Sequence, residues 1–528
     1  MPKSSETNFG KYFKLPNPGL MSYFGNVKKG QPNIYDTPFA RGESTEELLS
    51  KWMDVLVSIK TRWPSLWEFE EDLSKKVGPM SVMKPLSQRM TDIRSYYDGI
   101  LLPSEPLSER AIAAVISEWR SFGGLRPRNQ ADTLSLMKLS TNSGSPYFTK
   151  RRNAIDITVP CSVRFNSDEV IQQLGSDLWN ACAVLGWRGQ EGGPNKKDVK
   201  QRVVWMFPFA VNIRELQVYQ PLIEVAQRAN LVPAWVSMES VDKEITRLFD
   251  TKSDNDLIVC TDFSKFDQHF GPDMQDAARA ILQKILSPQA SDWLREVFPI
   301  KYMIPLAIQD DKILYGRHGM GSGSGGTNAD ETLAHRALQY EAAQQMGARL
   351  NPSSMCLGDD GILSYPGITV DDVVKAYSRH GLEMNQDKQY ASTQDCVYLR
   401  RWHHKDYRIR GVCAGVYATT RALGRLRYLE RFMDPDNWGP KMVALRQLSI
   451  IENVKYHPMR AEFVEFCMKR DKYRLGLDIP GFLDGIESEA KKAIDLMPDF
   501  LGYTKTLQSV DDVGGISNWW IVKYLKSK

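Results

Sequence analysis

Residues 355–363 read Met-Cys-Leu-Gly-Asp-Asp-Gly-Ile-Leu, a short acidic segment with apolar residues on both sides. The pattern is typical of two strands joined by a tight turn, with Asp359 and Asp360 at the tip of the hairpin. Two adjacent carboxylates are costly to bury alone, and a metal ion is their natural partner. A Gly-Asp-Asp tripeptide is weak evidence by itself, and a solvated acidic turn is the alternative.

A second acidic site lies upstream of this hairpin. Leu257–Thr261 is a continuous apolar run, typical of a buried strand, and it leads directly into Asp262. Asp267 follows after a turn and can face the same cavity. We therefore expect a small sheet in which carboxylates from two neighbouring strands meet at one edge.

Carboxylates that converge in this way suit two divalent cations about 3.5–4 Å apart, which activate an attacking hydroxyl and stabilise a leaving phosphate. Mg²⁺ fits best, because a few carboxylates and substrate phosphates are its usual ligands, and Mn²⁺ is the alternative ion. The predicted metal ligands are Asp262, Asp359 and Asp360.

The composition of the 528-residue chain, with 42% hydrophobic and 25% charged residues, is typical of a globular protein with several subdomains. The sequence predicts no signal peptide, because the N-terminus lacks an apolar core, and no membrane span, because no window of about 18 residues is uncharged and apolar. The seven cysteines are scattered without a C-x-x-C pair. This favours reduced thiols in a cytosol-like compartment over zinc or disulfides.

The segment Gly319–Asn328 is rich in glycine and serine and contains G-x-G-x-x-G. A dinucleotide-binding fold would need a second strand ending in an acid roughly 20 residues later, but Thr327–Met346 has the pattern of one helix. No Gly-Lys-Ser/Thr follows, which excludes a P-loop. The segment is therefore predicted to be a flexible loop that offers N–H groups and hydroxyls at a helix N-terminus.

Two basic segments are candidates for phosphate contacts. Lys200 and Arg202 alternate with apolar residues, so both cations leave one face of a strand and suit a triphosphate. Residues 400–431 hold nine Lys or Arg and two acids, a net charge of +7 against +4 for the whole chain. This favours a surface along a phosphate backbone. For both segments, a solvated basic face is the alternative.

In their order along residues 140–405, these segments resemble the motifs of viral RNA-dependent RNA polymerases. The resembling segments are Thr141–Pro146 (motif G), Lys200-x-Arg202 (motif F), Asp262-x₄-Asp267 (motif A), Ser322-Gly323-x₃-Thr327 (motif B), Gly358–Asp360 (motif C), Lys388 (motif D) and Tyr398–Arg401 (motif E). Residues 7–25 and the overall length are most similar to the polymerases of picobirnaviruses, which replicate a double-stranded RNA genome.

The resemblance implies a role for each of these segments. Asp262 and Asp359 would hold both metal ions, Asp360 would contribute less, and Lys388 would protonate the leaving pyrophosphate. The residues implied to bind the nucleoside triphosphate are Lys200, Arg202, Asp267 (which would read the ribose 2′-hydroxyl), Ser322, Gly323, Thr327 and Asn328. The residues implied to contact RNA are Ser143, Gly144, Pro146, Arg400 and Arg401.

One position departs from the family pattern. Many relatives carry an Asn four residues after the motif B Thr, where it hydrogen-bonds the sugar-reading Asp, but this chain has Glu331 there. Either Asn328 performs that task or the sugar is read differently. Asn328 and Glu331 also resemble a helix capping box, which would make both structural.

The implied architecture is an α+β right hand with fingers, palm and thumb, in which the palm is a small antiparallel sheet backed by helices and an N-terminal arm closes the cavity. The expected divisions are 1–65 (arm bridging fingers and thumb), 66–250 (fingers), 251–289 (palm, motif A), 290–318 (fingers insertion), 319–415 (palm, motifs B to E) and 416–528 (helical thumb with an aromatic C-terminal tail).

Three further segments carry local predictions. The turn-rich stretch Tyr12–Gly19 predicts an extended arm with exposed aromatics. Cys396–Trp402 is predicted to be one strand that leads into the basic segment 400–431. Trp519 and Trp520 are either a stacking platform for initiation, a plug, or ordinary thumb core.

The implied function is template-directed RNA synthesis for the transcription and replication of a viral genome, double-stranded and copied without a primer. The expected partners are single-stranded RNA template, double-stranded RNA product and nucleoside triphosphates, with viral capsid protein as a further candidate and no membrane. The expected location is the virion interior and the host cytoplasm.

Two alternatives remain, a reverse transcriptase that shares the palm and a non-catalytic RNA-binding virion protein. Asp267 favours ribonucleotides, because reverse transcriptases usually place a bulky aromatic at this position. Basic segments alone would suit the non-catalytic protein. They do not explain two acid-tipped strands beside a Gly/Ser loop.

Overall fold

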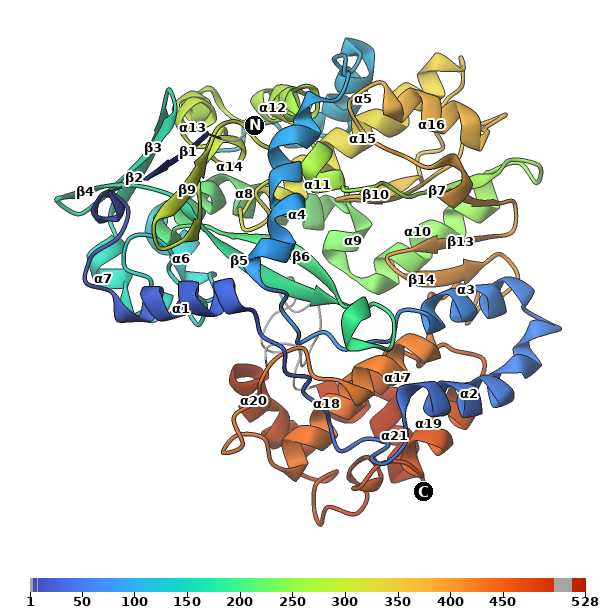
Figure 1. The fold of residues 1–528 in the computed structure, drawn as a ribbon. Helices are drawn as coiled ribbons and strands as arrows, with labels where there is room; N and C mark the ends of the chain where they lie inside the picture. Colours follow the sequence, from blue (N-terminus) through green and yellow to red (C-terminus); the bar gives the residue numbers. More distant parts are fainter. Residues whose placement is uncertain (1–2, 7, 498–514) are drawn as a thin grey trace.

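The computed structural model describes residues 3–6, 8–497 and 515–528, and both acid-bearing strands lie in one four-stranded sheet (Figure 1). The strand order is β10-β11-β7-β12, and every neighbouring pair is antiparallel. The strands are β10 (Met355–Leu357), β11 (Asp360–Leu363), β7 (Ile258–Thr261) and β12 (Tyr390–Ser392). The hairpin and the buried strand before Asp262 therefore form as predicted.

Helices pack behind this sheet, with α15 (Thr327–Gln345) in contact with β10 and with three further helices. These are α5 (Glu109–Glu118), α12 (Pro272–Ile285) and α16 (Val370–Ser378). Leu333, Ala334, Ala337 and Leu338 are buried along α15, as their spacing predicts. The small antiparallel palm sheet backed by helices is confirmed.

A five-stranded sheet with the order β1-β9-β8-β5-β6 forms the neighbouring part of the molecule (Figure 1). Its strands are β1 (Lys3–Glu6), β9 (Lys312–Tyr315), β8 (Leu306–Gln309), β5 (Ala183–Gln190) and β6 (Lys200–Met206). Residues 290–318 thus join the segment predicted as fingers through the pairing of β8 with β5.

Shorter elements complete this part of the molecule. The strands β2 (Cys161–Asn166), β3 (Glu169–Leu174) and β4 (Asp177–Asn180) form a separate antiparallel sheet. The remaining helices include α4 (Leu86–Asp98), α6 (Gln130–Ser135), α8 (Phe209–Ala229), α9 (Pro233–Val236) and α10 (Met238–Thr251).

Residues 8–30 differ from the predicted extended arm. Asn17 accepts a hydrogen bond from the Leu20 N–H and caps α1 (Pro18–Lys29), whose first residue is proline. Tyr12 and Phe13 are buried against β5 and β8 rather than exposed. The prediction of exposed aromatics was wrong, because these rings form the core that joins the arm to the five-stranded sheet.

The next segment of the arm packs against the C-terminal helices. In α2 (Thr45–Leu56) the Trp52 indole N–H donates to the Thr419 hydroxyl over 2.8 Å. In α3 (Pro64–Ser74) the buried Glu70 accepts from Thr420. The predicted boundary at residue 65 falls inside α3, so this contact with the thumb continues to the end of that helix.

The C-terminal part is helical, and its tail belongs to its core. Its helices are α17 (Thr419–Arg427), α18 (Pro440–Glu452), α19 (Arg460–Met468), α20 (Ile486–Leu496) and α21 (Trp520–Lys526). The Trp520 and Ile521 N–H groups donate to Glu452, and Val522 and Leu525 are buried. The described residues of the tail therefore bear out the prediction that it is ordinary thumb core.

Two expectations drawn from composition can also be compared with the described residues. All seven cysteines are buried free thiols, as expected. Within residues 3–6, 8–497 and 515–528, no helix is both long and apolar enough to span a bilayer.

Candidate active site

The strand register brings the motif A and motif C acids to one end of the sheet. Thr261 of β7 pairs with Gly361 of β11, so Asp262 leaves β7 beside Asp360. The turn between β10 and β11 is Gly358-Asp359, and Gly358 supplies the positive φ of 58°. Only Asp359 therefore lies in the turn and is exposed, whereas the prediction placed both acids at the tip.

Asp360 lies in β11 and faces the adjacent hairpin. Its Oδ2 accepts a hydrogen bond from the Leu399 N–H over 2.8 Å. Burial and the neighbouring Asp359 raise the pKa of Asp360 to about 7. An acid that is already engaged and reluctant to ionise is a weaker metal ligand, which agrees with the smaller role expected for Asp360.

Asp262 is held by a side chain that sequence reasoning missed. The Gln389 amide accepts from the Asp262 N–H over 2.7 Å and donates to the Asp262 carbonyl over 2.8 Å. This clamp places Lys388 beside Asp262. Surrounding protein raises the pKa of the Asp262 carboxyl, the Lys388 charge lowers it, and Asp359 raises it further.

Asp267 lies near the start of α11 (Phe266–His269) and is held from two sides. Its carbonyl accepts from the Met320 N–H over 2.8 Å, and its carboxyl lies within hydrogen-bonding reach of Glu331. The other candidate, Asn328, accepts from the Trp235 indole N–H over 2.7 Å. Glu331 therefore occupies the place beside Asp267.

The capping-box alternative for Asn328 and Glu331 was wrong. Gly326 is the N-cap residue of α15, and no side-chain hydrogen bond caps this helix. Both side chains instead lie beside the motif C turn. A Cβ built on Gly358 would lie 3.6 Å from Nδ2 of Asn328 and 3.9 Å from Oε2 of Glu331.

The Gly/Ser segment is clamped against β6 rather than flexible. The Ser322 hydroxyl donates to the Val203 carbonyl and accepts from the Trp205 N–H, each over 3.3 Å. A Cβ on Gly323 would lie 1.6 Å from the Trp205 carbonyl oxygen, so only glycine permits this approach. The Thr327 hydroxyl donates to the Gly321 carbonyl over 3.1 Å. These predicted substrate-binding residues also fix the loop to motif F.

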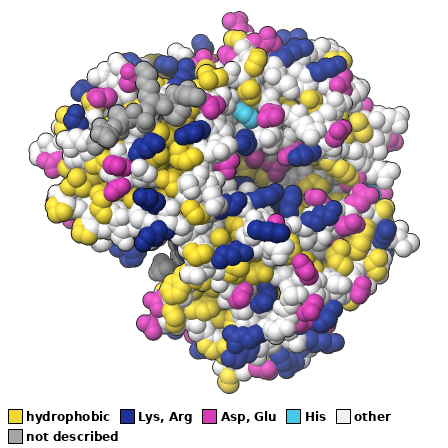
Figure 2. Space-filling view, in the orientation of Figure 1, with side chains coloured by type: hydrophobic (Ala, Val, Ile, Leu, Met, Phe, Trp, Pro, Cys, Tyr) yellow, Lys and Arg dark blue, Asp and Glu magenta, His cyan; other side chains and the backbone are white. Residues whose placement is uncertain are grey.

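Lys200 and Arg202 leave β6 on one exposed face, while Val203 and Trp205 are buried. The Arg202 charge lowers the pKa of Asp267, against the larger effect of burial, so this cation and motif A face the same space. Figure 2 shows Lys and Arg side chains gathered across the middle of one face of the molecule, beside a recess that contains acids. This arrangement suits a triphosphate.

The predicted strand Cys396–Trp402 is a hairpin. It comprises β13 (Asp395–Tyr398) and β14 (Arg401–His404), and a third strand, β15 (Val416–Tyr417), pairs with β14. Leu399 and Arg400 form the turn with φ of 53° and 58°. The single-strand prediction was wrong, because two ordinary residues adopt the left-handed conformation that glycine or asparagine usually marks.

The two arginines predicted to bind RNA at this hairpin lie in different surroundings. Arg400 is at the turn, with 44% of its side chain exposed, and pairs with Glu191 over 3.4 Å. Arg401 forms a two-pronged ion pair with Asp242, over 2.8 and 3.1 Å. Since these side chains are only 12% and 5% exposed, the pairing argues against an RNA contact by Arg401.

The motif G residues Ser143, Gly144 and Pro146 are enclosed by protein. The Ser143 N–H donates to the Thr149 carbonyl over 2.6 Å, and the Ser143 hydroxyl accepts from the Thr149 N–H over 3.1 Å. A Cβ on Gly144 would lie 2.8 Å from the Phe207 carbonyl oxygen. Their burial gives them a role in shaping this loop. Their predicted contact with RNA remains a prediction.

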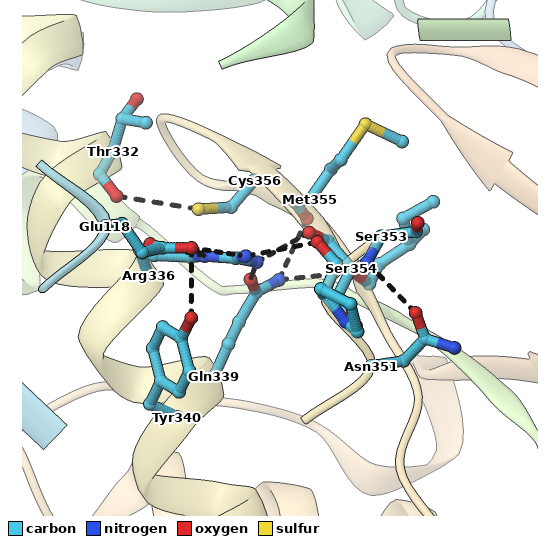
Figure 3. Close-up of polar contacts among 12 residues, drawn as sticks. Glu118, Thr332, Arg336, Gln339, Tyr340, Asn351, Ser353, Ser354, Met355 and Cys356 are labelled. Carbon is cyan, nitrogen blue, oxygen red and sulfur yellow. Dashed lines mark hydrogen bonds and ion pairs between the residues drawn. The ribbon is translucent and has the colours of Figure 1, made fainter. Parts of the chain in front are cut away.

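Polar residues of α15 support the motif C hairpin from behind (Figure 3). Gln339 donates to the Met355 carbonyl over 2.8 Å, and Arg336 reaches both Glu118 and the β10 segment. The Thr332 hydroxyl accepts from the Gly358 N–H over 3.0 Å. Sequence reasoning missed this support, although the polar residues recur at helical spacing along α15.

The donor chemistry of the site fits divalent cations. Among the described residues, no group of three or more His, Cys, Asp or Glu side chains is arranged to hold an ion as it stands. However, the charge of Asp359 raises the pKa of Asp262, Asp267 and Asp360, after the larger effect of burial. A cation would relieve this repulsion, and carboxylate oxygens are ligands that Mg²⁺ accepts.

Comparison with known proteins agrees with this geometry. Residues 88–465 match a family described as viral RNA-dependent RNA polymerase. The chain belongs to this family. A potential RNA-dependent RNA polymerase of human picobirnavirus is 61% identical over 526 residues, which are 98% of each chain. The protein is thus an RNA-dependent RNA polymerase, as its motifs imply.

Two crystal structures are similar along almost the whole polymerase. The RNA-dependent RNA polymerase of a human picobirnavirus is 60% identical, with a TM-score of 0.95 over 99% of this chain and 100% of the other. An insertion-loop deletion mutant of such a polymerase is 58% identical, with a TM-score of 0.93 over the same shares. The α+β polymerase fold is therefore confirmed.

Proposed function

We propose that this polymerase copies an RNA template by nucleotidyl transfer at two divalent metal ions held by Asp262 and Asp359. The observation that carries the proposal is the pairing of β7 with β11, which brings both acid-bearing strand ends to one edge of the sheet. Magnesium bound there, or manganese in its place, would activate the attacking hydroxyl and stabilise charge on the leaving phosphate. Asp360, engaged with Leu399, contributes less.

The surrounding residues bind and orient the nucleotide. Lys200 and Arg202 neutralise the triphosphate from the exposed face of β6. Lys388, placed beside Asp262 by the Gln389 clamp, donates a proton to the leaving pyrophosphate. The residues that line the nucleotide near motif B are Asp267, Ser322, Gly323, Thr327 and Asn328.

The polymerase acts on single-stranded RNA, yields double-stranded RNA and starts without a primer. Residues 3–6 and 8–74 contact both the five-stranded sheet and the C-terminal helices, which supports a template cavity closed by the arm. The proposed genome is double-stranded, as the resemblance to picobirnavirus polymerases implies, and the proposed places of activity are the virion interior and the host cytoplasm. A capsid contact stays outside the proposal, because no described surface singles out that partner.

Incorporation of labelled nucleotide on a single-stranded RNA template tests the proposal. Asp359→Ala removes the acid at the hairpin turn, so we expect it to abolish Mg²⁺-dependent incorporation and to leave RNA binding nearly intact. Asp371→Ala, which removes an exposed acid from α16, is the matched control and should keep wild-type activity. Retained incorporation by Asp359→Ala would overturn the assignment.

The reverse transcriptase alternative is tested by the same assay with deoxyribonucleotides. Asp267 can accept a hydrogen bond from a ribose 2′-hydroxyl and leaves room for it, whereas a bulky aromatic would exclude it. We therefore expect the wild-type polymerase to prefer ribonucleotides strongly. Equal use of both sugars, or preference for deoxyribonucleotides, would favour the alternative.

A further inference from the structure

Glu331 is a buried acid in the position where the family pattern has a neutral amide. Its side chain leaves the second turn of α15 and is only 3% exposed. It lies beside Asp267, and the charges of Asp359 and Asp330 also act on it. Two cations oppose these charges: Arg202 acts on Asp267 from β6, and the buried Lys301 pairs with Asp330 over 3.0 Å. Three other acids therefore surround Glu331.

Two observations indicate where the proton of this cluster lies. Two carboxyl groups within hydrogen-bonding reach need one proton between them, because two carboxylates offer only acceptors. In addition, the buried Oε1 of Glu331 has no hydrogen-bond partner in the described part of the chain. A buried oxygen without a donor is most costly when it carries charge, and protonation of Glu331 lowers that cost by making the group neutral.

The electrostatics agree with this assignment. Burial raises the pKa of Glu331 well above its usual value, and the adjacent Asp267 raises it further. Burial also raises the pKa of Asp267, but its hydrogen bond with Glu331 and the Arg202 charge oppose that rise. Because the Arg202 charge acts on Asp267, the assignment that fits these effects places the proton of the pair on Glu331.

We propose that Glu331 is a positioning residue that carries a proton, donates a hydrogen bond to ionised Asp267 and so orients Asp267 toward the ribose 2′-hydroxyl. The inference rests on the proposed function, because it needs a ribonucleotide in this site. A protonated carboxyl supplies the same kind of donor as an amide N–H. Asn328 does not substitute for it, since its amide oxygen is engaged by Trp235.

The proposal is tested by the ratio of kcat/KM for ribo- and deoxyribonucleotides. Glu331→Gln keeps a donor of similar length, so we expect a ratio within about threefold of the wild type. Glu331→Leu removes the donor and leaves Asp267 unsupported, so we expect roughly a tenfold to hundredfold lower ratio. The loss should fall on ribonucleotides, with deoxyribonucleotide incorporation little changed. A merely structural defect would lower both.

Asp267→Asn locates the proton. If Glu331 holds it, this variant removes the anionic acceptor, and the ratio falls as it does in Glu331→Leu. If Asp267 held it instead, Asp267→Asn would keep the wild-type ratio, which would overturn the proposal. Two other results would overturn it as well: a ratio in Glu331→Gln that falls as far as in Glu331→Leu, or an equal fall of kcat/KM for both sugars in Glu331→Leu. If the wild type itself incorporates no nucleotide, the proposed function fails rather than this inference.

Discussion

Two basic regions of the polymerase, β6 and the segment from β14 to α17, carry the same kind of residue in different surroundings. Lys200 and Arg202 remain on the exposed face of β6. In contrast, Arg401 is engaged by Asp242, which lies 159 residues away in the chain. The comparison shows that local charge counts do not identify the cations that remain available to a ligand, because distant acids pair with some of them.

A single acid pairs with three more arginines of the basic segment 400–431. Glu191 faces Arg400, Arg421 and Arg425 over 3.4, 3.5 and 2.9 Å. Burial raises the pKa of Glu191, but these three arginines outweigh that effect and hold it below the usual value. Part of the basic segment 400–431 therefore joins the β5–β6 loop to the thumb. The net charge of +7 did not predict this structural role.

The largest expected effect is on stability and comes from the buried ion pair. Arg401→Met should cost about 3–5 kcal/mol, because Asp242 would be left charged and without its partner in a buried site. We expect a lower urea midpoint for this variant and an unchanged RNA affinity for the folded protein. Arg401→Met combined with Asp242→Leu should recover most of the loss. Weaker RNA binding at unchanged stability would instead make Arg401 an RNA contact.

A smaller effect, and on activity rather than stability, is expected on β6. Arg202→Ala removes a charge-assisted contact to the triphosphate, so kcat/KM for nucleotides should fall roughly 100-fold, about 2.7 kcal/mol. The urea midpoint should not change, because Arg202 is exposed. Arg295→Ala, which removes an exposed arginine from α13 (Ser291–Glu296), is the control and should match the wild type in both assays. A large loss of stability in Arg202→Ala would contradict the distinction between the two regions.

The sequence predicted well the features that depend on neighbouring residues. The β10–β11 hairpin, the strand before Asp262 and the long helix after Gly326 form as expected, because periodicity and turn residues specify them locally. The helix α1 could also have been found, since Asn17-Pro18 is a strong helix start. Tyr12 and Phe13, just before this helix, suggested an exposed arm only because their partners on β5 and β8 are distant in sequence.

The misses at the site have a common physical cause. The turn at Leu399 and Arg400 lacks the glycine or asparagine that normally marks positive φ, so tertiary contacts must impose it. The Gln389 clamp and the Glu331–Asp267 pair join segments that are distant in the sequence. Local sequence patterns predict helices, strands and turns. The pairing of polar groups from distant segments depends on the completed fold.

The smallest expected effect comes from the ion pair between Arg408 and Asp250. Asp250 lies on the same helix as Asp242, about two turns further along α10. Arg408 and Asp250 lie 2.7 Å apart, but their side chains are 31% and 54% exposed. Because solvent screens this pair, Arg408→Ala should cost only about 0–1 kcal/mol and hardly shift the urea midpoint. A cost equal to that of Arg401→Met would show that burial does not separate the two pairs. A loss of RNA affinity that disappears at high salt would instead return Arg408 to the set of cations available to phosphate.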